Sequence, residues 1–370
     1  MSVQRPADAN PSPPAPARQA HIVGRILVRD PLVAIGGTEG RHLPLGPAPL
    51  LSPILGARAA CFLVQLRWTI ETRWRAERLI EAWRRQREAY PHHRVVVLAN
   101  TAREDVILQD AGVSSILAHQ NMFVSETTFA PDRSIPKTFD AVYNARLAPY
   151  KRHHLGAGIS SLALIHAALN PHEHAHAESL RRLMPQATFA NAVETAAALA
   201  GMTGARAAAA RRLAPIHGDI RMAPGRVAHW INRARVGLCL SAEEGAMQAS
   251  VEYLLCGLPI VSTVSLGGRE RYFDPAFCRI VPDDPQAVAD AVSDLAAARV
   301  DPQAVRAATL ARLVHDRRAF VDLVDAITVD LGGAGGFADQ LPALLGEPIL
   351  APRPIGDLLA EVAATHPAVR

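Results

Sequence analysis

The chain has 370 residues, of which 49% are hydrophobic and 20% charged, and its formal net charge is +4. This length accommodates two ordinary domains, and the small positive charge permits anionic ligands without requiring a nucleic acid partner. No uncharged apolar run reaches the roughly eighteen residues of a membrane-spanning helix, and the N-terminus lacks the pattern of a secretory leader. The scattered cysteines have no zinc-site spacing, which predicts buried, reduced thiols and a cytoplasmic protein.

The first part of the chain predicts a small α/β domain at residues 20–136, after a flexible, proline-rich tail at residues 1–19. Two extended apolar stretches come first, within residues 21–35. The glycine cluster at residues 36–40 and the proline-broken stretch at residues 44–53 then predict a turn and a loop. Beyond them strands and helices alternate, which predicts a parallel sheet covered by helices. The strands are expected at residues 59–66, 94–98 and 113–117, and the helices at residues 69–89 and 102–111.

The predicted helix at residues 69–89 is amphipathic. Its inner face repeats at helical spacing through Ala76, Leu79, Ile80 and Trp83, and arginines interleaved with glutamates cover the remainder. Such a face is usually a solvated surface held by salt bridges. The alternative is a docking face for an anionic membrane or a phosphate-bearing acceptor, which would make the protein a peripheral membrane protein.

Two polar positions of this domain follow the ends of predicted strands. Asn100 comes directly after the strand at residues 94–98, and His119 follows the next one. Because ligands bind at the carboxyl ends of strands in parallel sheets, both side chains are candidates for a cleft. A purely structural role for this loop histidine is the alternative.

Residues 123–136 predict a linker to a second domain at residues 137–330. That domain opens with a strand at residues 139–144, and Arg146 and Lys151 lie on the loop after it. An arginine offers a fork of donors and a lysine a point charge, so the two can clamp a diphosphate from two directions. The alternative is ordinary surface charge.

The second domain continues as alternating strands and helices. Strands are expected at residues 162–166, 188–191 and 278–281, and helices at residues 171–184, 192–213, 227–233, 287–297 and 302–326. His172, His174 and His176 fan around a helix axis, which argues against a zinc site. The C-terminal segment at residues 331–370 is rich in glycine and proline, with a helix near residues 355–364, and is expected to pack back on the first domain.

The stretch at residues 236–268 predicts a complete βαβ unit. A buried strand gives way to Glu243-Glu244-Gly245, a helix runs to Leu255, Gly257-Leu258-Pro259 ends it, and a second strand follows. The loop therefore lies at the carboxyl end of a strand, where ligands bind. The start of the helix leaves backbone N–H groups unpaired, and these donors suit an anion such as a diphosphate. They belong to Gly245, Ala246, Met247 and Gln248.

Glu244 and Glu252 are separated by eight positions, at the start of this helix and two turns inside it. At about 100° per residue they lean toward the same side, so a carboxylate pair lies beside the unpaired amides. This arrangement favours a ligand that carries both phosphate and hydroxyl groups. The alternative is that Glu244 only caps the helix and that Glu252 is a solvated surface residue.

Two motifs together resemble the family-4 retaining glycosyltransferases of GT-B architecture. The first runs from Glu244 through Glu252 to Gly257-Leu258-Pro259 and Gly267-Gly268, and the second is Arg-Leu-x-Pro-x-Lys from Arg146 to Lys151. The resemblance covers residues 95–325. It implies an α/β fold of GT-B type, with two Rossmann-like domains whose parallel sheets face each other across a cleft, the N-terminal one reduced.

The resemblance also implies site roles. Glu244 would contact the hydroxyls of the donor sugar, Glu252 the ribose, Arg146 and Lys151 the diphosphate, and the strand ending at Asn191 the base. Independently of the resemblance, the position of His119 after a strand makes it a candidate polar contact near the sugar, and Asn100 could face the same cleft. The implied reaction is transfer of a sugar from a nucleoside diphosphate sugar to a hydroxyl acceptor (a glycan, lipid or protein) with retention of configuration. No cofactor is expected, and because the donor loops lack an Asp-x-Asp motif, no metal.

Two other functions stay open. The first domain is short and no equivalent of the family's catalytic-face histidine is found in it, which motivates a non-catalytic nucleotide-sugar-binding or scaffold protein. A Rossmann dehydrogenase is the third candidate, and the lack of G-x-G-x-x-G after the first strand weighs against it.

Overall fold

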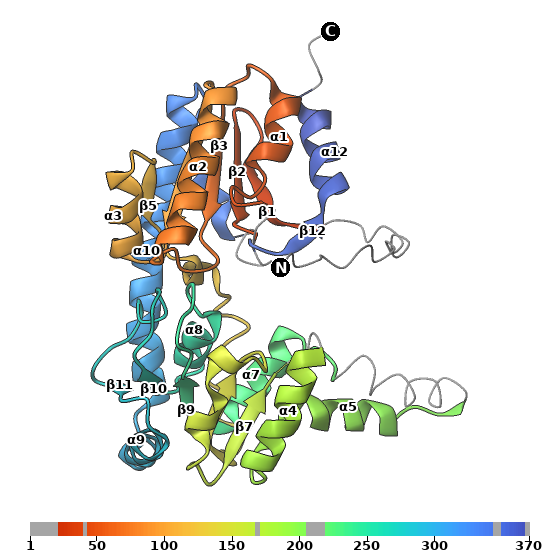
Figure 1. Ribbon diagram of the computed structural model, residues 1–370, viewed down its shortest axis with the longest axis vertical. Coiled ribbons are helices and arrows are strands. Elements are labelled where there is room, and N and C mark those ends of the chain that lie inside the picture. The colour runs from red at the N-terminus through yellow and green to blue at the C-terminus, as the bar shows by residue number, and fades with distance from the viewer. Residues whose placement is uncertain (1–20, 40–42, 167–170, 205–218, 343–348, 367–370) are drawn as a thin grey trace, which may run out of the picture.

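The computed structural model describes residues 21–39, 43–166, 171–204, 219–342 and 349–366. Two α/β domains, each built on a six-stranded sheet, lie one above the other in Figure 1. The expected pair of α/β domains is therefore confirmed. The tail expected at residues 1–19 lies outside the described residues.

The N-terminal sheet has the strand order β12-β1-β2-β3-β4-β5. The strands from β2 to β5 are parallel, as expected, but β1 and β12 are antiparallel to their neighbours. A turn of only a few residues joins β1 to β2, and such a turn can connect antiparallel strands only. The strands are β1 His21–Val28, β2 Leu32–Gly37, β3 Ala60–Gln65, β4 His93–Ala99, β5 Ser115–Leu117 and β12 Pro352–Pro354.

Alternation along the strands divides the core of this domain into two layers. Leu32 and Ala34 face one layer, which is closed by four helices, and Val33 and Ile35 face the other. The four helices are α1 Ala48–Leu55, α2 Arg73–Ala89, α3 Ala102–Asp110 and α12 Ile355–Thr365. The C-terminal segment lies against this domain, because β12 pairs with β1 and α12 packs against α1.

The prediction of a loop at residues 44–53 is wrong, because helix α1 begins at Ala48, inside that stretch. Pro47 is the N-cap and Pro49 lies in the first turn, where a helix has no use for the missing N–H group. Pro53 lies inside the short helix. Pro47 and Pro49 therefore begin a helix rather than prevent one.

The C-terminal sheet has the order β11-β10-β9-β6-β7-β8, and all its described pairings are parallel. The predicted strand at residues 188–191 stops at Phe189, and the next helix begins at Ala190 and ends at Ala200. Residues 205–213 of that predicted helix lie outside the described residues. The strands are β6 Phe139–Asn144, β7 Leu162–Ile165, β8 Thr188–Phe189, β9 Ala234–Cys239, β10 Ile260–Thr263 and β11 Cys278–Val281. The helices are α4 Pro171–Leu183, α5 Ala190–Ala200, α7 Pro224–Asn232, α8 Gln248–Leu255 and α9 Pro285–Ala298.

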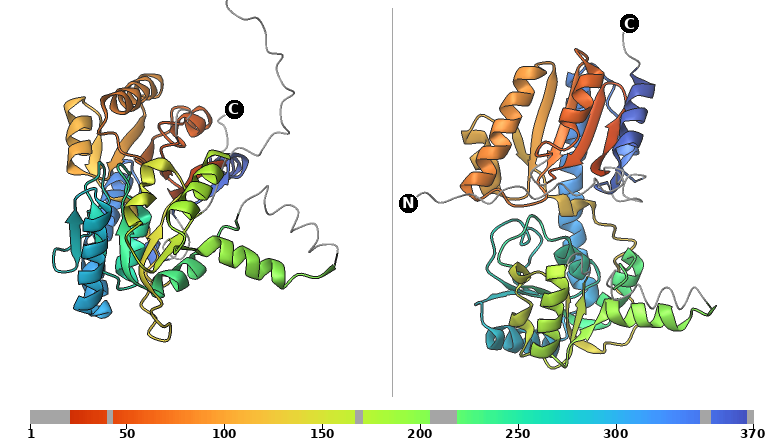
Figure 2. Two further views of the ribbon diagram at one scale, coloured as in Figure 1. Left: turned by 60° about the horizontal axis from the view of Figure 1, so that its bottom comes forward. Right: turned by 45° about the vertical axis from the view of Figure 1, so that its right-hand side comes forward.

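The long helix α10, Pro302–Asp330, joins the two domains. It packs against α8 of the C-terminal domain and against β2 of the N-terminal domain, and it runs along both in Figures 1 and 2. Its buried Arg317 donates to the backbone oxygens of Met122 and Val124 at 2.7 and 3.0 Å. Because one helix belongs to both cores, the relative placement of the domains is built into the fold. None of the described helices has the length and apolar character needed to cross a membrane.

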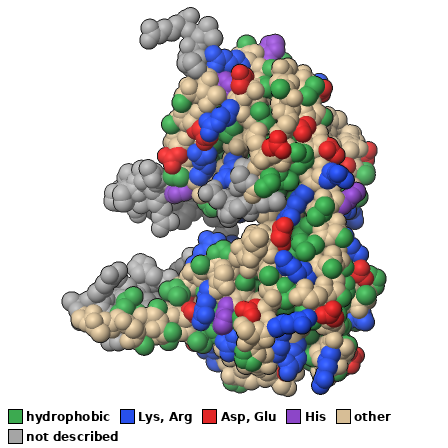
Figure 3. Space-filling view, turned by 180° about the vertical axis from the view of Figure 1, so that it is seen from behind, with side chains coloured by type: hydrophobic (Ala, Val, Ile, Leu, Met, Phe, Trp, Pro, Cys, Tyr) green, Lys and Arg blue, Asp and Glu red, His purple; other side chains and the backbone are tan. Residues whose placement is uncertain are grey.

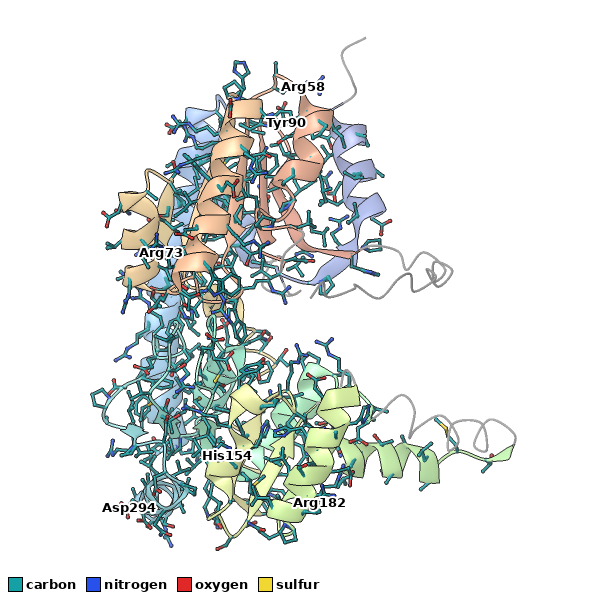
Figure 4. All side chains as sticks on the ribbon, viewed as in Figure 1. Arg58, Arg73, Tyr90, His154, Arg182 and Asp294 are labelled. Atoms are coloured by element: carbon teal, nitrogen blue, oxygen red, sulfur yellow. The ribbon has the colours of Figure 1, made fainter. Side chains whose placement is uncertain are left out.

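The surface of α2 supports the solvated interpretation of its charges. Arg73 pairs with Glu77 at 2.7 Å, and Arg85 pairs with Glu81 one turn further along the same helix. Figure 4 shows Arg73 at the end of α2 that faces the C-terminal domain. These two arginines are therefore paired on a solvated surface. The helix as a whole carries six arginines and three glutamates and keeps a net positive charge.

Candidate functional site

Two neighbouring strands of the C-terminal sheet bring the predicted charged residues together. β6 and β9 are parallel neighbours, so their carboxyl ends meet at the same edge of the sheet. The loop after β6 ends in the 3-10 turn Pro149–Lys151, and the loop after β9 carries Glu244. Lys151 and Glu244 are 8% and 4% exposed, and Lys151 Nζ forms an ion pair with Glu244 Oε1. A cation and a carboxylate from different loops therefore meet at the strand ends.

Glu244 is held from a second side as well. The Ser241 hydroxyl donates to the same oxygen, Oε1, that binds Lys151. Among the described residues, none hydrogen-bonds to Oε2 of Glu244. The carboxylate is therefore fixed through one oxygen, and the other is available to accept a hydrogen bond from a hydroxyl group of a ligand.

The backbone around the Lys151–Glu244 pair is held by buried polar groups. The Tyr143 hydroxyl donates to the Lys151 carbonyl at 2.7 Å. Arg152 donates to the carbonyl oxygens of Leu240 and Ser241 at 2.6 and 3.0 Å, and the fully buried Arg269 donates to Ser241 O at 2.8 Å. These hydrogen bonds fix both loops before any ligand arrives, which is the preorganisation that an electrostatic site requires.

Arg146 has a different partner in this structure. Its guanidinium donates to Glu173 Oε1 in the first turn of α4, at 3.0 Å from Nε and 2.5 Å from Nη2. Its side chain is half exposed, whereas Glu173 is buried. Tyr150 lies beside these groups, with its ring centroid 5.1 Å from Lys151 Nζ. Burial raises the pKa of Tyr150, and the carboxylates of Glu244 and Glu173 raise it further, whereas Arg146 lowers it. The structure thus brings Lys151 to Glu244 and leaves Arg146 bound to α4 beside them.

Glu252 is buried and is not a solvated surface residue. Its carboxylate accepts hydrogen bonds from Asn144 Nδ2 and Gln248 Nε2, each at 3.0 Å. Burial raises the pKa of Glu252 to about 7, against the opposing effect of these two hydrogen bonds. Asn144 ends β6, so Glu252 faces the same edge of the sheet as Lys151.

The turn before α8 lies under the N-terminal domain. A Cβ added to Gly245 would lie 2.4 Å from the Arg67 carbonyl oxygen, so the two backbones are in close contact. Asn121 Nδ2 donates to the carbonyl oxygens of Ala246 and Met247 at 2.7 and 3.2 Å. Met247 has a left-handed backbone, with φ of 44°, which directs the chain into the helix that starts at Gln248. The amides singled out from the sequence are therefore located where the domains meet. Figure 3 shows the molecule from behind, with the two domains in contact along one side.

His119 and Asn100 are buried and have protein partners. His119 Nε2 donates to the Gly268 carbonyl oxygen at 2.7 Å across the interface, and its Nδ1 accepts from Asn121 N at 3.2 Å. Burial lowers the pKa of His119 to about 4, so the ring is neutral and both nitrogens are used. Asn100 Nδ2 donates to Leu66 O at 2.7 Å. In this arrangement both residues hold loops together and leave no polar atom for a sugar.

Asn191 lies in the first turn of α5 rather than on a strand. It is buried, its Oδ1 accepts from His166 N at 2.7 Å, and its Nδ2 donates to Ile220 O at 2.7 Å. These bonds join the end of β7 to the segment before α7. No described contact joins Asn191 to Glu244 or Lys151.

A set of contacts across the interface was not anticipated from the sequence. Arg75 on α2 binds both carboxylate oxygens of Glu243 at 3.0 Å. The Trp68 ring meets the Tyr150 ring edge to face, with centroids 5.4 Å apart. The amphipathic pattern of α2 placed Arg75 on an outer face, and only the position of the other domain shows what that face contacts. Within the described residues, no group of three or more potential metal ligands is found.

The two α/β domains, each built on a six-stranded sheet, match the GT-B fold of solved glycosyltransferase structures. HepE from Anabaena, solved in complex with UDP-glucose, is similar with a TM-score of 0.53 and 12% identity, over 79% of this chain and 78% of that one. A complex of HepE with UDP gives a TM-score of 0.52 and 12% identity over 78% and 85% of the two chains. TarM gives a TM-score of 0.51 and 11% identity over 75% and 57%. No protein-family model and no curated protein sequence matches the chain. At such low identity, the similarity concerns the fold.

Proposed function

We propose that the protein is a glycosyltransferase, which moves a sugar from a nucleoside diphosphate sugar to a hydroxyl acceptor. The observation that carries the proposal is the buried pair of Lys151 and Glu244 beside the turn that starts α8, where two GT-B domains meet. The likeness to HepE, which was solved with UDP-glucose, supports a nucleotide-sugar donor. Retention of configuration and independence from metal are part of the proposal, and they rest on the resemblance of the two motifs.

Each group has a chemical task in this proposal. Negative charge develops on the departing diphosphate, and Lys151 with the amides of residues 245–248 neutralises it. Glu244 accepts a hydrogen bond from a hydroxyl group of the sugar through its unused oxygen, Oε2. Glu252 accepts hydrogen bonds from the hydroxyl groups of the ribose. Arg146 reaches the diphosphate by exchanging Glu173 for a phosphate oxygen, because both partners are oxygen acceptors for a guanidinium fork.

The first experiment is a thermal-shift screen of the full chain against UDP-, GDP- and ADP-sugars. A ligand that binds only the folded state adds about 2.7 kcal/mol to the free energy of unfolding at a concentration one hundred times its Kd, and the melting temperature rises as a result. We expect one nucleotide class to raise the melting temperature. Transfer from that donor to a panel of hydroxyl acceptors then follows.

The matched variants are Lys151→Met and Lys137→Met. Lys137 is an exposed lysine of the same domain and lies outside the site. We expect the first variant to lose at least a hundredfold in transfer rate and the second to keep the wild-type rate. Unchanged transfer by the Lys151 variant contradicts the proposal.

A non-catalytic nucleotide-sugar-binding protein is the second candidate. Two observations favour it: Arg146 is bound to Glu173, and the imidazole of His119 is enclosed between the domains with both nitrogens used. Calorimetry that detects donor binding, together with no hydrolysis or transfer across the acceptor panel, selects this candidate. No binding of any nucleotide sugar rejects both. The cytoplasmic location stays a prediction.

A further inference from the structure

A pocket of about 220 Å³ lies in the N-terminal domain, between the loop after β3 and the first turns of α2. Its wall is mainly apolar and includes two tryptophans, Trp68 and Trp74, with Leu66, Ile70 and Leu79. Trp74 remains 53% exposed at the rim. The volume is below the roughly 300–1,000 Å³ of pockets that enclose a whole drug-sized ligand, so it suits one part of a larger molecule.

The pocket lies close to the Lys151–Glu244 pair, with two aromatic rings between them. The Trp68 ring lies 5.4 Å from the Tyr150 ring, and Lys151 Nζ lies 5.1 Å from that same ring. A single pair of aromatic rings therefore separates the pocket from the lysine. The backbone N of Trp68 is also adjacent to the Gly245 turn, since a Cβ on Gly245 would lie 3.0 Å from it.

The wall of the pocket also holds the loop that carries Glu244. Arg75, which lines the pocket, binds Glu243 through two hydrogen bonds of 3.0 Å, and its guanidinium carbon lies 5.8 Å from the centroid of the Trp68 ring. The hydrogen bonds from Arg75 keep the pKa of Glu243 below its ordinary value, so it stays ionised and paired. Because Glu243 directly precedes Glu244, the position of the pocket wall fixes the position of the turn at residues 243–247 before α8, the proposed donor turn.

We infer that this pocket binds the apolar part of an amphiphilic hydroxyl acceptor, such as an alkyl, prenyl or aryl chain. The inference rests on the proposed function and deepens it by assigning the acceptor class. Covering an apolar wall and an exposed tryptophan with a hydrocarbon removes apolar surface from water, which lowers the free energy of the bound state. The hydroxyl end of such an acceptor, seated past Trp68, faces Tyr150 and Lys151, where the sugar is released.

The test uses alkyl β-D-glucosides as probes, titrated calorimetrically into the full chain without any donor and below their micelle concentrations. Each buried methylene adds about 0.8 kcal/mol, equivalent to roughly a fourfold gain in affinity. We expect octyl glucoside to bind at least a hundredfold more tightly than methyl glucoside. Equal affinities for the two probes overturn the inference.

Variants place the binding in this pocket. Trp74→Ala removes an exposed rim side chain, and we expect it to weaken octyl glucoside binding at least tenfold. Trp74→Leu keeps an apolar side chain and is expected to recover part of that loss. Val106→Ala, which truncates an apolar residue 55% exposed on α3, is the matched control and should bind as the wild type does. Octyl glucoside binding that Trp74→Ala leaves unchanged overturns the assignment.

The two proposals fail separately. Donor binding and transfer without any dependence on alkyl chain length leave the glycosyltransferase proposal intact and reject the acceptor pocket. Chain-length-dependent binding that is lost in Trp74→Ala, in a protein that binds no nucleotide sugar, supports an apolar-ligand pocket and rejects the transferase.

Discussion

Replacement of Lys151 by methionine probes the centre of the site through stability alone. The side chains of Lys151 and Glu244 are 10% and 6% exposed, so removing the ammonium leaves a carboxylate buried with one hydroxyl donor, Ser241. Breaking a buried ion pair from one side costs about 3–5 kcal/mol. The remaining hydrogen bond places our expectation near the lower end, at about 3 kcal/mol.

The expected effect is large enough for scanning calorimetry. A domain of 150–250 residues shifts by about 2–4 °C for each kcal/mol, so Lys151→Met should lower the melting temperature of the C-terminal domain by about 6–12 °C. Methionine keeps the unbranched shape of the lysine stem, which limits the loss to the charge. The scans are made without ligand, so the result is independent of any activity.

A double-mutant cycle then isolates the pair. Glu244→Gln alone leaves the Lys151 ammonium with a neutral acceptor, and the double variant removes both charges together. We expect the double variant to lose at least about 2 kcal/mol less free energy of unfolding than the two single variants lose when their losses are added. Lys137→Met is the control. Additive losses, or single variants within about 1 °C of the wild type, refute the view that this pair is a buried, energetically coupled unit.

Three further predictions follow from the remaining contacts. Because the pKa of Glu252 is about 7, its carboxylate takes up a proton as pH falls from 8 to 6, and we expect the nucleotide sugar selected by the thermal-shift screen to bind about tenfold more weakly at pH 6 by calorimetry. Gly245→Ala places a Cβ 2.4 Å from the Arg67 carbonyl oxygen, and we expect the domains to separate, with a larger radius of gyration in X-ray scattering. The pKa of His119 is about 4 in the folded chain, so stability should fall by about 3 kcal/mol because of this residue as pH decreases from about 6.5 to about 4, measured by urea unfolding.

Each of these predictions has its own control. Glu252→Gln cannot titrate, so a pH dependence that persists in it assigns the effect to another group. Gly225→Ala, at a glycine with nothing within 4 Å of the added Cβ, should scatter as the wild type does. For His119 the sign follows from linkage: above pH 6.5 both states are neutral, and below it only the unfolded chain takes up the proton. His119→Asn should remove about 3 kcal/mol of the acid loss and leave the part due to the buried His153 and His166, whose pKa values burial also lowers. The exposed His154→Asn should leave the acid loss unchanged.

The order of the elements and the location of the donor turn were predictable from local patterns. Alternating strands and helices require crossover connections, which produce parallel sheets, and the carboxyl ends of adjacent strands then lie together. This reasoning predicted that the loop with Lys151 and the loop with Glu244 belong to one edge of a sheet. It failed at α1, where prolines that begin a helix resembled prolines that prevent one.

The partners of the charged and polar side chains depended on the tertiary fold. The sequence assigned Arg146 and Lys151 the same task, yet a helix start from α4 brings Glu173 to one and β9 brings Glu244 to the other. His119 became a buried link to Gly268 because the N-terminal domain packs directly on that turn. Periodicity describes how side chains point from one element and contains no record of which distant element lies opposite.

By itself, the sequence determined the two α/β domains, the acidic turn that begins α8 and the cation that follows β6, because each depends on residues close together in the chain. The tertiary structure decided which charges meet, which histidine is enclosed, and that Trp68 and Arg75 link an apolar pocket to the donor turn. Those contacts join residues from elements far apart in the chain, so no local pattern records them. The long helix α10 packs against both domains between which some of these contacts run.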